Sequence, residues 1–356
     1  MTTQSQTMNF FASEDVARKR TAELALLFVL AALLEIAGFS LIAAAAAIWV
    51  AQSDKMSADF STIVKDCLLY VSPIVLAILV IGFISRLIQL RGGGSAIAEM
   101  LDGELLPAAP QDLGDKTLRD VVDEMAIAAG VSPPAVYVLR DEASINAFSA
   151  GQAGKDAVIG VTAGALEKLS RDELQGVIAH EFSHILNRDT VLNMRTLAVV
   201  YALASISFIG YVLFRITSAG RWDRKSGSII FALFAAGAAL VVLGLIGGFL
   251  GRLVRASVTR QRESLADASA VQFTRNPQAV AAALYKIETV GSLLTHHRTE
   301  ELNHFLFADG IDSGWHKLRF LATHPPIKDR IRAVDPSFLA THFTWTDNAS
   351  PDPPPN

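Results

Sequence analysis

The chain has 356 residues, of which 51% are hydrophobic, and it carries a formal net charge of −4 at pH 7. Its apolar residues are gathered in long runs, which excludes an ordinary water-soluble protein and indicates a membrane protein. The negative charge argues against nucleic acid as a partner, and the single cysteine, Cys67, excludes an internal disulfide.

Two apolar runs near the N-terminus are long enough to form transmembrane helices. Leu24 to Val50 is interrupted only by Glu35, and Cys67 to Leu90 follows it; each meets or exceeds the roughly 20 residues that cross a bilayer. The first run is too long for a signal-peptide core, so we expect a retained anchor. We predict a cytoplasmic N-terminal segment over residues 1–23 and a transmembrane hairpin over residues 24–90. Glu35 is expected either to pair with another span or to lie near the interface, where water reaches it.

The region after this hairpin, residues 91–193, has the pattern of a mixed α and β structure. Leu118 to Ala129 has helical periodicity and ends at Gly130. Three short runs after it are typical of β-strands: Ala135 to Leu139, Ile145 to Ser149 and Ala157 to Val161. We therefore predict a small sheet accompanied by helices.

The most specific motif of the chain is H-E-x-x-H, at His180, Glu181 and His184. On a helix this spacing places two imidazoles one turn apart with a carboxylate beside them, which is the geometry that binds zinc and activates a water. A helix is expected here because Ser170 and Glu173 form a capping box. The alternative is an ordinary amphipathic helix with two surface histidines.

Two further apolar runs follow the motif. Thr196 to Ile216 and Ser228 to Gly251 are both long enough to cross a bilayer, so we predict a second transmembrane hairpin over residues 194–254. A buried core helix is the alternative for the second and third runs of the chain. Glycines of the fourth run, among them Gly244 and Gly247, either permit close helix approach or reflect the abundance of glycine in membrane helices.

A hydrolytic zinc site needs a third protein ligand, for which Glu263 is the best candidate. Glu263 and Asp267 lie one turn apart on the same face of a helical stretch. A carboxylate ligand with a nearby acceptor for a histidine N–H is a sensible pair, although a solvated charged helix beyond a span is the alternative. We predict that residues 91–193 and 255–345 are the two parts of a zinc protease domain, and that the Pro-rich residues 346–356 form a disordered tail.

Four spans would place both termini and the H-E-x-x-H motif on one side of the membrane. Arg18, Lys19 and Arg20 precede the first span, whereas the loop after it has no positive excess. The positive-inside rule therefore favours a cytoplasmic N-terminus and cytoplasmic catalysis. The basic loop from Arg221 to Lys225 disagrees, because this topology sends it to the far side.

These motifs as a set resemble the HtpX family of membrane zinc metalloproteases, relatives of the CAAX prenyl proteases. The matching features are Arg91 to Gly94, Asn146 to Phe148, His180 to His184, Asn187 to Asp189, Glu263 to Asp267, and His324 to Pro326 with Arg330 and Ile331. The resemblance implies that Glu263 is the third ligand, with Asp267 and Asp189 in support of the ligands. It also implies quality-control proteolysis of membrane proteins at the cytoplasmic face of a bacterial inner membrane.

Zinc proteases of this kind hold an extended peptide beside the edge of a sheet. We predict that this substrate edge runs from Asn146 to Ser149, with Asn146, Ala147 and Phe148 as its substrate-binding residues. An interior strand of a small sheet is an equal alternative on the sequence.

The expected mechanism uses the metal and one base. Zinc polarises a water, and Glu181 takes its proton as general base before giving it to the leaving amine. By resemblance, His324 and Arg330 are candidates for stabilising the oxyanion. The alternative for these two residues is a turn followed by a packing helix, with the arginine in a structural ion pair.

The predicted fold class is α+β, with four transmembrane helices plus a mainly helical zincin-type catalytic domain and a small β-sheet. The predicted function is a zinc metalloendopeptidase with one Zn²⁺ per chain, with the lipid bilayer and unfolded or membrane protein substrates as its partners. A CAAX-type prenyl-protein protease is one alternative, and a catalytically idle scaffold is another, which the intact Glu181 argues against. A site-2 type intramembrane protease is disfavoured, because Arg171 and Asp189 make the zinc helix too polar for immersion.

Overall fold

The computed structural model describes residues 10–53, 59–152, 154–219, 227–308 and 324–338. The chain divides into two compact units: the first unit comprises residues 1–91 and 192–258, and the second unit comprises residues 92–191 and 259–356. Three predicted features lie outside the described residues, namely the beginning of the N-terminal segment at residues 1–9, the basic loop from Arg221 to Lys225, and the tail over residues 346–356.

Four long helices carry the apolar runs. They are α1 (Phe10–Ser53), α2 (Phe60–Gln89), α7 (Asp189–Ala219) and α8 (Gly227–Thr274). By length and composition, four stretches could cross a membrane: residues 26–52, 60–92, 189–219 and 229–249. Many large apolar side chains are exposed on these helices, as lipid-facing side chains are; Leu30, Ile81 and Val242 are each more than half exposed. The prediction of four helices of membrane-spanning length is confirmed.

Within the first unit, Glu35 is buried against α8. Glu35 is 1% exposed, and a Cβ atom on Gly247 would lie 1.8 Å from its Oε1 atom. Its carboxyl group makes no hydrogen bond within the described part of the chain. A Cβ atom on Gly244 would lie 2.6 Å from the backbone nitrogen of Ser207 on α7. Both glycines therefore permit close contact between helices, which favours the packing alternative for them.

The second unit holds a four-stranded sheet in the order β1-β2-β4-β3. Its strands are β1 (Glu104–Leu105), β2 (Ala135–Leu139), β3 (Ala147–Ala150) and β4 (Val158–Thr162). β2 and β4 are parallel, whereas β1 pairs with β2 and β3 pairs with β4 in antiparallel fashion. The three predicted strands are confirmed with small shifts at their ends. β1 was not predicted, because a strand of two residues carries no periodic signal.

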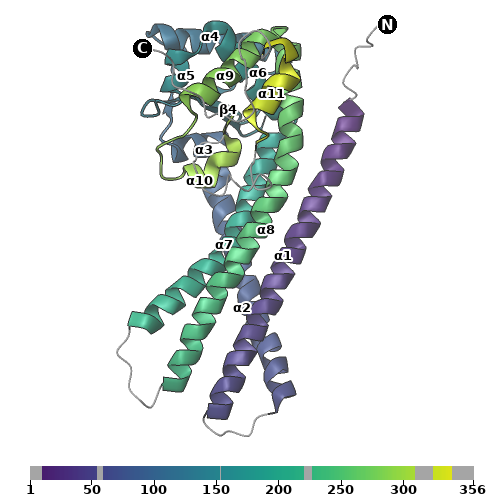
Figure 1. Ribbon diagram of the computed structural model, residues 1–356, viewed down its shortest axis with the longest axis vertical. Helices are drawn as coiled ribbons and strands as arrows, with labels where there is room; N and C mark the ends of the chain where they lie inside the picture. Colours follow the sequence, from purple (N-terminus) through teal and green to yellow (C-terminus); the bar gives the residue numbers. More distant parts are fainter. Residues whose placement is uncertain (1–9, 54–58, 153, 220–226, 309–323, 339–356) are drawn as a thin grey trace. The chain divides into compact units, whose positions relative to one another are not determined.

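Helices accompany this sheet in the second unit (Figure 1). They are α3 (Gly94–Met100), α4 (Leu113–Ala129), α5 (Ala163–Lys168), α6 (Arg171–Leu186), α9 (Pro277–Val290), α10 (Thr299–Leu302) and α11 (Ile327–Val334). α4 ends at Gly130, as predicted, with a φ of 68° in the left-handed region. Val121, Ile159, Ile178 and Leu284 belong to one shared apolar core. Through this core α6 packs against α4, α9 and β3.

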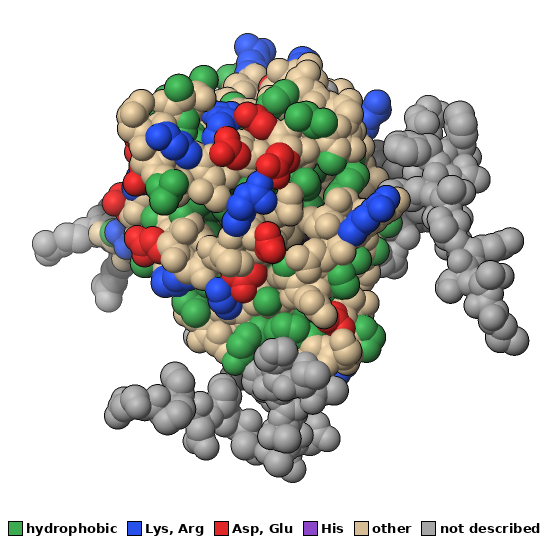
Figure 2. Space-filling view, turned by 90° about the horizontal axis from the view of Figure 1, so that it is seen from above, with side chains coloured by type: hydrophobic (Ala, Val, Ile, Leu, Met, Phe, Trp, Pro, Cys, Tyr) green, Lys and Arg blue, Asp and Glu red, His purple; other side chains and the backbone are tan. Residues whose placement is uncertain are grey.

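The observed fold class is α+β, as predicted: a mainly helical chain with one small sheet. On the face shown in Figure 2, which lies over the second unit, basic and acidic side chains are interspersed. A mixed surface of this kind is typical of water-exposed protein, in contrast to the apolar surface of the long helices.

Candidate metal centre

Helix α6 carries the H-E-x-x-H motif, and local contacts fix its position. The Ser170 hydroxyl accepts a hydrogen bond from the Glu173 backbone N–H at 3.4 Å, and the Glu173 carboxylate accepts one from the Ser170 backbone N–H at 2.7 Å. The predicted capping box is therefore confirmed. Lys286 of α9 forms an ion pair with the same carboxylate at 2.7 Å. A Cβ atom on Gly176 would lie 3.0 Å from Val280 Cγ2, so glycine lets α9 approach α6 closely.

The turn after α6 supplies a carboxylate to the motif. Asn187 ends the helix, and Arg188 has a φ of 58°, in the left-handed region that few non-glycine residues adopt. Asp189 then begins α7, and its Oδ2 atom lies 3.0 Å from Nδ1 of His184. Arg262 of α8 pairs with the other carboxylate oxygen of Asp189. Asp189 thus fixes the ring of His184, and Arg262 fixes Asp189.

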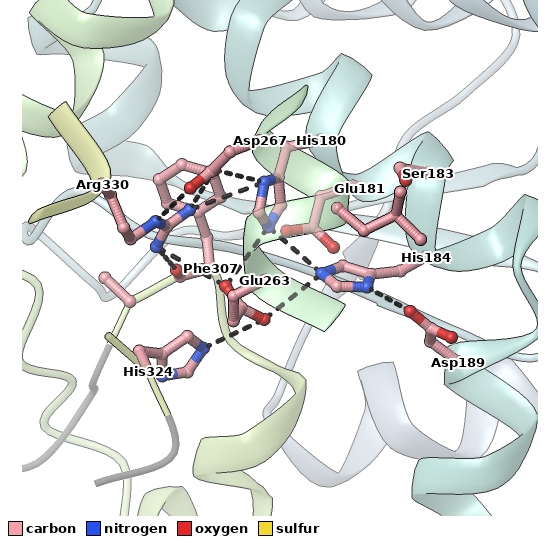
Figure 3. Close-up of polar contacts among 12 residues, drawn as sticks. His180, Glu181, Ser183, His184, Asp189, Glu263, Asp267, Phe307, His324 and Arg330 are labelled. Atoms are coloured by element: carbon pink, nitrogen blue, oxygen red, sulfur yellow. Dashed lines mark hydrogen bonds and ion pairs between the residues drawn. The ribbon is translucent and has the colours of Figure 1, made fainter. Parts of the chain in front are cut away.

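Helix α8 brings the third residue to the motif (Figure 3). His180, His184 and Glu263 each offer one ligand atom, and these atoms lie within 4.8 Å of one another, a group that could hold a metal ion. The two Nε2 atoms are 3.1 Å apart. Oxygens of Glu263 lie 3.6 Å from Nε2 of His180 and 3.5 Å from Nε2 of His184. One turn further along α8, Asp267 Oδ1 lies 2.9 Å from Nδ1 of His180. The three predicted ligands therefore converge.

The hydrogen-bond partners of the two rings favour a cation between them. Each Nδ1 atom faces a carboxylate, from Asp267 for His180 and from Asp189 for His184, which accepts the N–H of that ring nitrogen. The two Nε2 atoms then face each other and the carboxylate of Glu263. Glu263 Oε2 is buried and has no hydrogen-bond partner among the described residues. A divalent metal would satisfy all of these atoms, and the nitrogen and carboxylate donors fit zinc.

Burial and neighbouring charges shift the pKa values of the carboxylates of this site in opposite directions. Burial raises the pKa of Glu263, but the neighbouring positive groups, led by His324, outweigh burial and hold this pKa well below its ordinary value. Burial also raises the pKa of Asp267, yet Arg330 and His180 bring it down to about 2. Both carboxylates are therefore ionised at neutral pH, and they provide the negative charge that a metal ion requires.

A buried arginine stands behind His180. Arg330 of α11 is 2% exposed and donates from Nε and Nη2 to the two oxygens of Asp267, at 2.8 and 2.7 Å. Its Nη1 donates to the backbone carbonyl of Phe307 at 2.9 Å, and the Phe307 ring centroid lies 4.6 Å from that of His180. Bidentate pairing of this kind is strong and directional. For Arg330, this geometry favours the structural ion pair over direct contact with reacting atoms.

His324 is also close to the third ligand. Its side chain is buried, and its Nε2 atom lies 3.8 Å from Oε1 of Glu263 (Figure 3). An imidazole N–H at this place could donate to an oxygen that develops negative charge near the metal. The role of His324 as an oxyanion donor stays a prediction.

The two carboxylate oxygens of Glu181 have different surroundings. Oε2 accepts a hydrogen bond from the Ser149 hydroxyl at 2.6 Å, whereas Oε1 is buried and has no hydrogen-bond partner among the residues that the structure describes. Sequence reasoning placed Ser149 at the end of the candidate substrate edge but missed its contact with Glu181, and it missed Arg262. Arg262 directly precedes Glu263 in the sequence, and this position was the only indication of its role. No local sequence pattern connects Ser149, which lies on a strand, with Glu181, which lies on a helix.

The predicted substrate edge lies on the last strand of the sheet order, β3. Part of its outer side is paired with the segment Leu306–Ala308. The Phe307 N–H donates to the Ala147 carbonyl at 2.8 Å, and Phe148 faces this segment in an isolated antiparallel bridge. The Asn146 side chain donates to the last carbonyl of the segment at 3.0 Å. A substrate strand would have to displace this segment or pair beyond it, and the role of Asn146, Ala147 and Phe148 in substrate binding stays a prediction.

Comparison with known proteins shows the family of the chain. The family model of peptidase family M48 matches residues 112–337. The chain belongs to peptidase family M48. A curated relative of this M48 peptidase, named Protease HtpX homolog, from Thermoanaerobacter pseudethanolicus, is 37% identical over 235 residues, covering 64% of this chain and 74% of the relative. A second Protease HtpX homolog, from Listeria monocytogenes serotype 4a, is 33% identical over 270 residues, covering 75% of this chain and 87% of the relative.

Among solved structures, this M48 peptidase is similar to S. mikatae Ste24p. The TM-score is 0.39 at 17% identity, and the match covers 81% of this chain and 61% of that chain. The predicted resemblance to HtpX-like metalloproteases is confirmed by the family match and by the curated relatives. The matched residues 112–337 contain every residue of the metal centre. The protein is therefore an HtpX-like membrane metalloprotease.

Proposed function

We propose that this M48 peptidase is a zinc-dependent endopeptidase that cleaves misfolded or damaged membrane proteins. The observation that carries the proposal is the convergence of His180, His184 and Glu263 within 4.8 Å. Glu181 lies between the two histidines in the sequence of α6, and its Oε1 atom is buried without a hydrogen-bond partner in the described chain. A purely structural metal site needs no base at that place. The three residues would hold one Zn²⁺ and leave one coordination position open.

Each side chain of the site has a separate role in the proposed hydrolysis. Bound zinc would polarise a water molecule and lower its pKa toward neutrality. Glu181 takes the proton of the water at Oε1 and later gives it to the leaving amine. Asp267 and Asp189 keep the two ligand rings oriented through their Nδ1 atoms. His324 is the candidate donor to the oxyanion of the tetrahedral intermediate, and Arg330 acts through Asp267.

The proposed place of this activity is the inner membrane of a bacterium, with the site facing the cytoplasm. Four helices of membrane-spanning length and the bacterial sources of the curated relatives support a multi-pass bacterial membrane protein. The basic residues before the first span support the cytoplasmic orientation. From this side the enzyme would reach loops and unfolded segments of membrane proteins.

The activity is tested with detergent-purified protein, an unfolded protein and a prenylated peptide, with zinc and with a chelator. The wild-type protein should cleave the unfolded protein only when zinc is present. Glu181→Gln keeps the shape of the side chain but removes the base, so cleavage should fall by at least about a hundredfold while zinc stays bound. Undiminished cleavage by this variant would exclude the mechanism, and cleavage of the prenylated peptide alone would identify the CAAX-type alternative.

The orientation is tested by cysteine labelling in a Cys67→Ser background. Single cysteines replace Glu167 and Ala333, which are exposed in the second unit, and Ser226, which follows the basic loop. Glu167 is preferred to Ser170 because Ser170 caps α6. An impermeant reagent added to intact spheroplasts should modify only the cysteine at position 226. Labelling at the other two positions would invert the topology and move proteolysis to the opposite compartment.

A further inference from the structure

We infer that Ser149 is a positioning residue for peptide hydrolysis, because its hydroxyl holds the Glu181 carboxylate in the orientation that leaves Oε1 for the reacting water. The inference rests on the proposed role of Glu181 as the base. It adds to the site a residue that lies on the sheet, outside the H-E-x-x-H helix.

The contact between Ser149 and Glu181 is short and shielded from water. The distance from Oγ to Oε2 is 2.6 Å, and the residues are 3% and 1% exposed. A hydrogen bond donated to a carboxylate in such surroundings is stronger than one between neutral groups, and no water competes for it. It therefore fixes the orientation of the Glu181 carboxylate about its terminal torsion, which has broad minima.

The hydrogen bond also makes the two oxygens of Glu181 unequal. Oε2 is occupied by Ser149, and Oε1 has no hydrogen-bond partner among the described residues. A base must present one oxygen to the proton that it takes, within hydrogen-bond reach and in a fixed direction. Ser149 determines which oxygen Glu181 presents, because its hydroxyl occupies Oε2, the oxygen that does not react.

The strand that carries Ser149 is held firmly in the sheet. Ser149 faces Ile159 of β4 in the antiparallel register, and its neighbour Phe148 faces Gly160. A Cβ atom on Gly160 would lie 1.9 Å from the Phe148 ring, so glycine leaves the room that this ring fills. Side chains alternate along a strand, which places the hydroxyl of Ser149 on the face opposite Phe148, toward α6. A donor on such a rigid element can define the direction of a catalytic carboxylate.

The first test compares Ser149→Ala with Ser183→Ala. Ser183 is a matched control, because it is a buried hydroxyl on α6 that contacts Asn187, at 3.1 Å. Ser149→Ala should lower kcat about tenfold, as expected when one oriented hydrogen bond is lost. KM and zinc content should not change, and Ser149→Thr, which keeps the hydroxyl, should recover most of kcat. An equal kcat for the two alanine variants, or a fall that follows loss of zinc, overturns the inference.

The second test asks whether Ser149 acts through Glu181. If it does, Ser149→Ala should have almost no further effect on kcat in a Glu181→Gln background, because the effects of coupled residues do not add. An undiminished tenfold effect in that background contradicts the inference, while the proposed function remains intact.

A binding measurement tests the role of Ser149 without measuring catalysis. A peptide hydroxamate chelates zinc and can hydrogen-bond to the carboxylate of Glu181. Calorimetry on the zinc-loaded protein should show weaker hydroxamate binding for Ser149→Ala than for Ser183→Ala, and no such difference in the Glu181→Gln background. Equal affinities overturn the inference. If the wild-type protein cleaves nothing, the proposed function fails, and these affinities still decide the role of Ser149.

Discussion

The two units of this protein bury acidic side chains in opposite ways. In the first unit Glu35 is 1% exposed, it lies against Gly247, and its carboxyl group has no hydrogen bond within the described chain. In the second unit Glu263 and Asp267 are buried to a similar degree, but each lies close to histidine and to Arg330.

The comparison shows that the buried carboxylates with charged partners lie at the candidate metal site. A buried charge is costly unless opposite charge and hydrogen bonds offset it. In the second unit, opposite charges and hydrogen bonds offset this cost. These contacts form a network in which each member depends on the others. Removing one member of that network should therefore have a large effect, whereas removing the isolated acid of the first unit should have a small one.

The largest effect is expected from the third ligand. Glu263→Ala removes one donor of three, so purified protein should lose its zinc and its peptidase activity together. Metal analysis after gel filtration measures the loss. Ser264→Ala, an exposed neighbour on α8, is the control and should keep one zinc per chain. Stoichiometric, tightly held zinc in Glu263→Ala would remove Glu263 from the site.

The next effect concerns the buried ion pair. Arg330→Met keeps an apolar stem but leaves the Asp267 carboxylate without its bidentate partner, which should destabilise the protein by about 3–5 kcal/mol. The melting temperature in detergent should fall clearly. Arg332→Met on the same helix is the control, because Arg332 is exposed and its ion pair with Asp329 contributes little. Equal melting temperatures for the two variants would show that the pair is dispensable.

A smaller effect is expected from the carboxylate behind His184. Asp189→Asn keeps the size of the side chain but weakens its hold on the ring, so zinc affinity should fall about 10–100-fold. Competition with a chromogenic chelator measures this change. Asp172→Asn, exposed in the first turn of α6, is the control. An unchanged affinity in Asp189→Asn would assign the ring orientation to other contacts.

The smallest effect is expected at the isolated acid of the first unit. Glu35→Met replaces a buried polar group that has no hydrogen bond in the described chain by an apolar one of similar volume, which is nearly neutral or stabilising. The melting temperature in detergent should stay the same or rise, and zinc content should be unchanged. A large fall in melting temperature would mean that Glu35 belongs to a network after all. That result would contradict the contrast drawn between the two units.

The sequence predicted the parts of the fold that have local signals. Four long apolar runs, the helix end at Gly130 and the capping box at Ser170 all appear in the structure, because each depends on residues close together in the chain. The ligand pair His180 and His184 is local in the same sense, since both lie on one helix.

The missing parts depend on contacts between distant segments. Ser149 and Glu181 are 32 residues apart, and Asp189 and Arg262 are 73 residues apart. Such pairs are created by the packing of β3 on α6 and by the meeting of α7 with α8, and no periodicity along the chain encodes them. The same reason explains why the pairing of Leu306–Ala308 with β3 was not foreseen.

The order of the ligands along the chain has a consequence for biosynthesis. Synthesis proceeds from the N-terminus, so His180 and His184 leave the ribosome first, and both apolar stretches over residues 189–219 and 229–249 follow before Glu263 exists. A nascent chain therefore carries the proposed base and two candidate ligands but cannot complete the candidate metal site until its membrane helices have been made. Arg330, which stabilises Asp267, comes later still. A protease built in this order is incomplete while it is being inserted, and it gains a full site only once its membrane helices exist.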